Sequence, residues 1–84
     1  MPTISFFYGI TIFMHLSDKE HNPPHIHDFY GEYEASFLIS NSKKLNGKFP
    51  KNGIRLVEEF INKYREELNE MWNTGIIKKL PPIR

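Results

Sequence analysis

The sequence predicts one α+β domain spanning residues 1–84, a small antiparallel β-sheet of three to five strands with one long C-terminal helix packed on it. Three observations lead to this prediction. Much of the first half alternates apolar and polar residues with the period of a strand. Residues 54–72 instead repeat apolar residues with helical spacing. A length of 84 residues is enough for one compact domain and too short for two.

The composition excludes several classes of protein. With 39% hydrophobic and 14% aromatic residues, the chain is typical of a folded globular protein rather than a disordered one. The absence of cysteine excludes a disulfide framework, a thiolate metal site and a thiol nucleophile. The apolar residues 1–16 are too few to span a membrane and lack the features of a signal peptide. We therefore expect a cytoplasmic protein that has no membrane partner.

The first two predicted strands are Thr3–Tyr8 and Ile10–Met14, and both alternate with period two. This alternation predicts that Ile4, Phe6 and Tyr8 share one face of the first strand. Gly9 separates the two strands and indicates either a tight turn or a bulge.

A β-hairpin is predicted next. Residues 17–24 form a loop, because the diproline Pro23-Pro24 excludes a helix there. The strands 25–30 and 33–40 follow, and Gly31-Glu32 between them matches a two-residue type II′ turn. This turn predicts an apolar core face made of Tyr33, Ala35, Phe37 and Ile39, and an outer face made of His25, His27, Glu34 and Ser36. Asp28 is the polar exception on the core face, so we expect it near the edge of that face.

The second half is predicted to be mainly helical. Residues 41–49 are expected to be a turn-rich connection, and Pro50 suits the first turn of a helix. Gly75 suits its C-terminal cap, and residues 76–84 are expected to add an edge strand. The apolar stripe that should face the sheet consists of Val57, Phe60, Ile61, Tyr64, Leu68, Met71 and Trp72.

Charge divides the chain into two unequal parts. Residues 1–42 contain one base and five acids, a net charge of −4, whereas residues 43–84 contain ten bases and five acids, a net charge of +5. The second part favours an anionic partner. Because five acids share it, the pattern is only a weak indication of nucleic-acid binding.

The candidate site is the cluster of His21, His25 and His27. Residues i and i+2 of a strand project from the same side, about 7 Å apart, so His25 and His27 can share a divalent metal such as Zn²⁺. His21 would be the third metal ligand, with Asp18, Glu20 and Glu34 as acidic alternatives.

Two other interpretations of the cluster stay open. Without metal, His25 and His27 can act as catalytic general base and general acid in phosphoryl transfer, including RNA cleavage. In a purely structural interpretation, the diproline and the histidines only brace a loop, and the protein is not an enzyme.

The order of several segments resembles domain-of-unknown-function family 4160 (DUF4160) over nearly the whole chain. The segments that carry the resemblance are Met1-Pro2-Thr3-Ile4-Ser5, Phe7-Tyr8-Gly9-Ile10, His21-Asn22-Pro23-Pro24-His25-Ile26-His27, Tyr30-Gly31-Glu32-Tyr33-Glu34-Ala35, Gly47-Lys48-Phe49-Pro50, Leu56-Val57-Glu58-Glu59-Phe60 and Glu67-Leu68-Asn69-Glu70-Met71-Trp72.

The resemblance implies a bacterial protein that is half of a two-gene module of the toxin–antitoxin type. Its cognate partner would be a small protein, often of domain-of-unknown-function family 2442, and this chain would be the toxin-like half. The site carried over is centred on His21, His25 and His27, with RNA as the substrate if it is nucleolytic. The alternatives are a metal-binding, hydrolase-like domain and a non-catalytic protein-interaction module.

Overall fold

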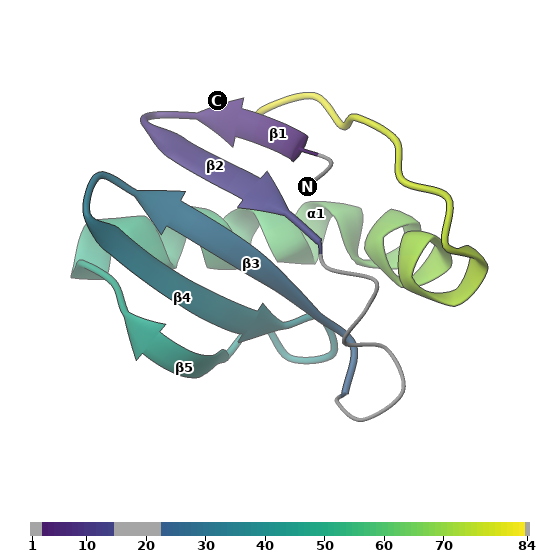
Figure 1. The fold of residues 1–84 in the computed structure, drawn as a ribbon, viewed down its shortest axis with the longest axis horizontal. Helices are drawn as coiled ribbons and strands as arrows, with labels where there is room; N and C mark the ends of the chain where they lie inside the picture. The colour runs from purple at the N-terminus through teal and green to yellow at the C-terminus, as the bar shows by residue number, and fades with distance from the viewer. Residues whose placement is uncertain (1–2, 15–22, 84) are drawn as a thin grey trace.

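The computed structural model describes residues 3–14 and 23–83, and it confirms the predicted α+β fold. An antiparallel five-stranded sheet has the order β1-β2-β3-β4-β5, and the helix α1 covers one of its faces (Figure 1). The elements are β1 (Thr3–Phe7), β2 (Ile10–Phe13), β3 (His25–Tyr30), β4 (Tyr33–Leu38), β5 (Lys44–Lys48) and α1 (Lys51–Thr74).

The β3–β4 hairpin has the predicted register. His27 lies opposite Ser36 and Asp28 lies opposite Ala35, with Gly31 in the turn at a φ of 60°. The positive φ explains the glycine, because a side chain is strained in that conformation. The predicted core face is confirmed for Ala35, Phe37 and Ile39, which are buried, whereas Tyr33 beside the turn is 44% exposed.

The first strand departs from the predicted alternation. Of the two alternatives at Gly9, the structure has the tight turn, with φ values of 50° at Tyr8 and 80° at Gly9. However, the prediction that Ile4, Phe6 and Tyr8 share one face is wrong. The register shifts between Thr3 and Ser5, and Ile4 and Phe7 are buried while Phe6 is 63% exposed. A bulge adds one residue to a strand, and this reverses the facing of the residues that follow it.

β5 was predicted as a turn-rich connection, and that prediction is wrong. The segment pairs with β4 as an edge strand in which every residue is exposed. Its polar sequence gives no alternation to detect, so pairing with β4 decides its conformation. Gly47 has a φ of 91°, and a Cβ there would lie 2.7 Å from the Cα of Ala35. The close backbone contact therefore requires glycine at this position.

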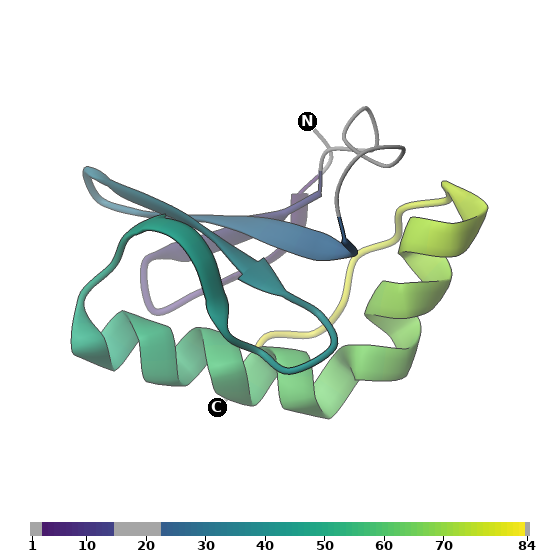
Figure 2. The same cartoon turned by 90° about the horizontal axis from the view of Figure 1, so that it is seen from below.

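The helix α1 has 24 residues, and the predicted apolar stripe from Val57 to Trp72 is buried. It ends as predicted at Gly75, which adopts a left-handed conformation with a φ of 77°. A kink interrupts it at Tyr64, where φ is −116° and ψ is 25°. Figure 2 shows the consequence, since the second half of α1 turns up toward the end of the sheet.

A hydrogen-bond network holds the kink against the β4–β5 connection. The Nε of Arg65 donates to the carbonyl oxygen of Ile39 at 2.7 Å, and its second guanidinium nitrogen donates to the Oγ of Ser42 at 2.8 Å. The Oδ1 of Asn62 accepts hydrogen bonds from Ser42 and from Arg65. Tyr64 lies between these helical residues and is neither proline nor glycine. The anchored side chains on both sides of it therefore define the position of the bend.

The C-terminal tail was predicted to add an edge strand, and that prediction is wrong. Within the described residues 75–83 the tail has no regular structure, and the N–H of Leu80 donates to the carbonyl oxygen of Ile4 at 2.8 Å. Pro81 and Pro82 follow immediately and have no N–H to extend a ladder. The tail instead contributes the buried side chains of Leu80 and Ile83 to the core.

The packing of α1 on the sheet gives a stability prediction. Phe60 is fully buried and its ring stacks 5.2 Å from that of Phe7. We expect Phe60→Ala to lower the free energy of unfolding by about 3–5 kcal/mol, because it leaves a cavity between helix and sheet. Urea denaturation measures this, with Glu59→Ala on the exposed side of the helix as the control. A Phe60→Ala protein as stable as the parent would show that the helix packs through another face.

Candidate functional site

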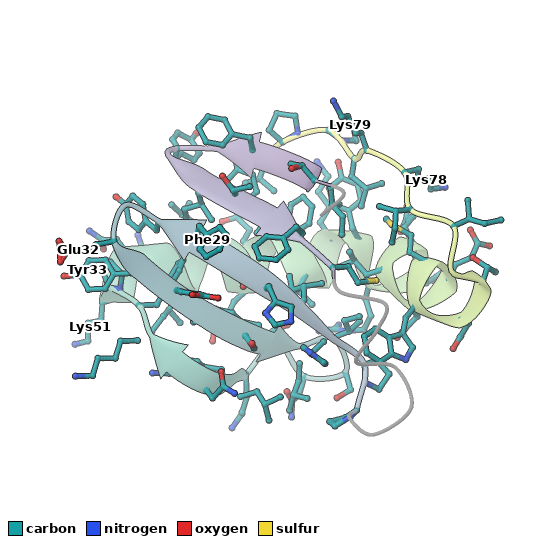
Figure 3. All side chains as sticks on the ribbon, in the orientation of Figure 1. Phe29, Glu32, Tyr33, Lys51, Lys78 and Lys79 are labelled. Atoms are coloured by element: carbon teal, nitrogen blue, oxygen red, sulfur yellow. The ribbon has the colours of Figure 1, made fainter. Side chains whose placement is uncertain are left out.

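The face of the sheet opposite α1 carries the predicted histidines, and we call it the outer face. His27 occupies its centre, with Phe13 opposite it on β2 and Ser36 opposite it on β4. His25 and Phe29 precede and follow His27 on the same side of β3, because alternate residues of a strand share a face. Figure 3 shows Phe29 lying over this face of the sheet, with α1 behind it.

His25 is a buried side chain, with 4% of its surface exposed. Its Nδ1 lies 2.8 Å from the carbonyl oxygen of Pro23, and its ring lies 5.2 Å from that of Trp72 on α1. A carbonyl oxygen can only accept, so Nδ1 is the donor in this hydrogen bond. Pro23 and Trp72 thus hold the ring of His25 from two sides.

His27 is half-buried, and it differs from His25 in its contacts. Its ring stacks on Phe13 at 5.4 Å with an angle of 17° between the planes, and its Nδ1 lies 3.3 Å from the Oγ of Ser36. The rings of His25 and His27 are 5.0 Å apart and inclined at 64°. The structure therefore brings together the two strand histidines that the sequence singled out.

The two histidines belong to a continuous row of aromatic rings. Phe13 extends the row beyond His27, with the ring of Phe29 at 4.8 Å, and Trp72 begins it beside His25. The apolar stripe of the helix predicted Trp72 as a core residue alone, and its contact with His25 has no signal in the sequence. A row of packed rings restricts rotation of the imidazoles, so both are preorganised for binding or chemistry.

The third predicted metal ligand cannot be placed. His21, and with it Asp18 and Glu20, lies outside the described residues. Within residues 3–14 and 23–83, no group of three or more histidine, aspartate and glutamate side chains is close enough to hold a metal ion. Glu34 lies opposite Phe29, in the row of the sheet next to His27, and is exposed. The described part of the site is therefore a pair of imidazoles.

Asp28 contradicts the expectation that it lies near the edge of the core face. It is 0% exposed on the central strand, between Ile12 on β2 and Ala35 on β4. Within residues 3–14 and 23–83, neither of its carboxyl oxygens has a hydrogen-bond partner. The hairpin register predicted its face correctly, but pairing of β3 with both β2 and β4 places Asp28 in the centre of that face rather than at its edge.

Burial raises the pKa of Asp28 well above its ordinary value, because the apolar surroundings disfavour the charged form. In the unfolded chain the pKa of an aspartate is about 3.9. The folded protein therefore releases this proton at a higher pH than the unfolded chain does. The stability that protonated Asp28 contributes is fully present below the pKa of the unfolded chain. It is lost as the pH rises towards the pKa of Asp28 in the folded protein.

We predict that Asp28→Val stabilises the protein at neutral pH and removes this pH dependence. The reason is that valine suits a central strand and leaves no buried acid to ionise. The measurement is the free energy of unfolding between about pH 5 and pH 8, where the parent should lose stability as the pH rises. Asp28→Asn is the matched control, because it keeps a polar group but cannot ionise. A parent protein that gains stability across this range would contradict the assignment.

Among the hollows on the surface of the described residues, two lie away from the histidine pair. One is lined by residues 62–67 of α1, namely Asn62, Lys63, Arg65, Glu66 and Glu67. The other lies between the β3–β4 turn and the start of α1, and is lined by Tyr30, Gly31, Glu32, Tyr33, Pro50 and Asn52. Neither hollow could be predicted from the sequence, because the residues that line each of them form no recognisable motif. In the described residues, no helix is long and apolar enough to cross a membrane.

Comparison with known proteins identifies the family. Residues 9–73 match the family described as Domain of unknown function (DUF4160), so the chain belongs to it, and the resemblance seen in the sequence is confirmed. The matched region includes β2, the histidine segment, the hairpin, β5 and nearly all of α1. No curated protein and no solved structure matches the chain.

Proposed function

Starting from membership of the DUF4160 family, we propose that this protein is the toxin-like half of a two-protein module and that it cleaves RNA through the outer-face histidines. The observation that carries the proposal is the His25–His27 pair, two imidazoles 5.0 Å apart on one strand. A positioned histidine is the most common general base in proteins, because its pKa lies near neutral pH.

The two histidines have different roles in this proposal. His27 is half-buried and meets the substrate, whereas His25 is 4% exposed and positions the ring of His27. In the tautomer in which the Nδ1–H of His27 donates to Ser36, its Nε2 carries the lone pair that a general base needs. His25 is thus a positioning residue, and His27 is the candidate catalytic residue.

The proposed reaction is intramolecular transfer of the phosphate. His27 takes the proton of the ribose 2′-hydroxyl, and the 2′-oxygen forms a bond to phosphorus. The bond from phosphorus to the 5′-oxygen of the next nucleotide breaks, and that oxygen takes a proton from water. The products are a 2′,3′-cyclic phosphate and a 5′-hydroxyl end, and His27 returns its proton to solvent.

The cognate small protein is proposed to act by covering the outer face. Phe6 is 63% exposed and pairs with Thr11 on β2. Thr11 points away from the core, unlike its buried neighbours Ile10 and Ile12, so Phe6 lies on the same face as the histidine row. An exposed phenylalanine is an anchor that a protein partner can bury. Phe6 is two strands away from His27, so a partner that binds Phe6 and extends over β2 and β3 would block the approach of RNA.

We predict that expression of the chain alone slows bacterial growth and that His27→Gln abolishes this effect, because the general base is lost. His27→Gln should fold normally, since a half-buried residue on the outer face contributes little to the core. The measurement is growth after induction, with cleavage of a labelled RNA by the purified protein. Glu32→Gln in the exposed hairpin turn is the control. A folded His27→Gln protein as toxic as the parent would contradict the role of His27, and a parent without toxicity would favour a non-catalytic interaction module.

A metal-binding hydrolase is the second candidate, and one observation favours it. The Nδ1 of His25 contacts the carbonyl oxygen of Pro23 at 2.8 Å. Metal-bound histidines commonly donate their second ring N–H to a backbone carbonyl in this way, which directs the Nε2 lone pair toward the metal. His27, and His21 from the sequence, would complete the ligand set.

We predict for this candidate that Zn²⁺ raises the melting temperature, because a ligand that binds only the folded state stabilises it by mass action. The His25→Ala/His27→Ala protein should lose the shift. Thermal melts of untagged protein over a range of Zn²⁺ concentrations measure this, with chelator-treated protein as the reference. Superimposable melting curves with Zn²⁺ and with chelator would exclude the metal site.

A further inference from the structure

A continuous positive segment joins the end of the sheet to the start of the helix. Residues 43–55 contain no acidic residue, and every residue of β5 is exposed. The first turn of α1 also lacks an acidic residue. We call the exposed cations of this segment the basic edge, and they are Lys43, Lys44, Lys48, Lys51 and Arg55.

The basic edge occupies one side of the molecule. β5 is the outermost strand of the sheet, and α1 starts shortly after it (Figure 1). Figure 3 shows Lys51 on this side, whereas Lys78 and Lys79 of the tail lie on the opposite side. The lysines of the basic edge are therefore well separated from Lys78 and Lys79 of the tail, and β5 of the basic edge pairs with β4.

The sheet register connects the basic edge to the histidine row. Asn46 on β5 lies opposite Ser36, which lies opposite His27. In the next row Lys48 lies opposite Glu34, which lies opposite Phe29. Two strand spacings amount to about 10 Å, so the β5 part of the basic edge, with Lys48, borders the same face as the candidate site, and Lys51 and Arg55 continue it onto the start of α1. Glu34 is the one acid in these rows, and it stands between Lys48 and Phe29.

We propose that the basic edge binds the phosphate backbone of single-stranded RNA and directs the chain of nucleotides across the outer face to His27. This proposal rests on the proposed function and names its substrate-binding surface. Exposed lysines that follow a backbone, next to aromatic rings on which bases can stack, are the general means by which proteins hold single strands. Here Phe29 is the half-buried ring nearest to the basic edge by register.

The structure favours RNA over an acidic protein strand added to β5. Strand addition needs a regular edge with open backbone groups. In β5 the Nζ of Lys44 donates to the carbonyl oxygen of Gly47 at 2.8 Å, and the register shifts between Ser36 and Phe37 on β4. These features disrupt the edge as a template for another strand. These irregularities do not affect the positive charge of β5, and phosphate groups can bind to exposed lysines without a regular strand edge.

The test compares two charge-matched double variants. Lys48→Gln/Lys51→Gln removes two cations of the basic edge, and Lys78→Gln/Lys79→Gln removes two cations of the tail. Each protein is titrated against a fluorescein-labelled oligouridine of about 20 nucleotides, and binding is followed by anisotropy over a series of salt concentrations. A glutamate-rich peptide of similar length, labelled in the same way, is the second probe.

We expect the basic-edge variant to bind the oligouridine about tenfold more weakly at low salt. The slope of log K against log salt should fall by about 1.4, because two phosphate contacts are lost. The tail variant should bind like the parent. Equal losses in both variants would overturn the proposal, since they indicate an effect of net charge alone. A parent that binds the peptide through Lys48 and Lys51 but not the oligouridine would also overturn it.

The His27→Gln protein separates this proposal from the proposed function. If it binds the oligouridine like the parent while Lys48→Gln/Lys51→Gln binds more weakly, the basic edge is supported whether or not the parent cleaves RNA. If the parent binds through the basic edge but neither cleaves RNA nor slows growth, the nucleolytic function fails and the binding surface stands. Loss of binding in His27→Gln together with normal binding in Lys48→Gln/Lys51→Gln would overturn the basic edge as the binding surface.

Discussion

The fold depends on burying one apolar face of a five-stranded sheet beneath a single helix. Among the described residues, α1 is the helix that covers this face, and it packs Phe60 against Phe7 of the edge strand β1. The bend at Tyr64, held by Arg65 against the β4–β5 connection, turns the second half of α1 toward the strands (Figure 2). The bend therefore allows the residues of α1 that follow Tyr64 to pack in the same core as those before it.

The same bend connects the core to the candidate site. Trp72 belongs to the buried cluster beneath the sheet, and its ring also contacts His25 at the start of β3. Docking of the helix thus fixes the first imidazole of the row, which in turn contacts His27. A disturbance of the helix end is expected to reach the site through this contact, because packed aromatic rings move together rather than independently.

The central strand β3 carries opposite chemistry on its two faces. His27 and Phe29 point to the outer face, while Asp28 between them is buried against the core, where no group of the described part of the chain forms a hydrogen bond with its carboxyl. An unpaired carboxyl in an apolar core is destabilising at neutral pH, and such groups are rare in small domains. The outer face, bordered by the exposed cations of β5, carries the row of imidazole and aromatic rings instead. Both interpretations of the histidine pair use the Nε2 lone pair and differ in whether it accepts a proton or binds a metal.

Local patterns in the sequence determined the hairpin register, the extent of the helix and the pairing of His25 with His27 on one face. Alternation, the Gly31-Glu32 turn and the apolar stripe up to Trp72 act over a few residues and can be recognised without tertiary information. The site could therefore be predicted as a histidine pair, but not as a row of rings that includes Trp72.

Contacts between distant segments decided the rest. The bulge in β1 and the strand β5 arise from pairing with neighbours, and neither has a sequence pattern of its own. The burial of Asp28 depends on β2, β4 and α1 together, so its position within the face was wrong even though its side of the strand was right. The kink at Tyr64 depends on Arg65 reaching the carbonyl of Ile39. A chain determines locally which way each residue of a strand faces, but which residues become central or peripheral depends on which other segments pack around them.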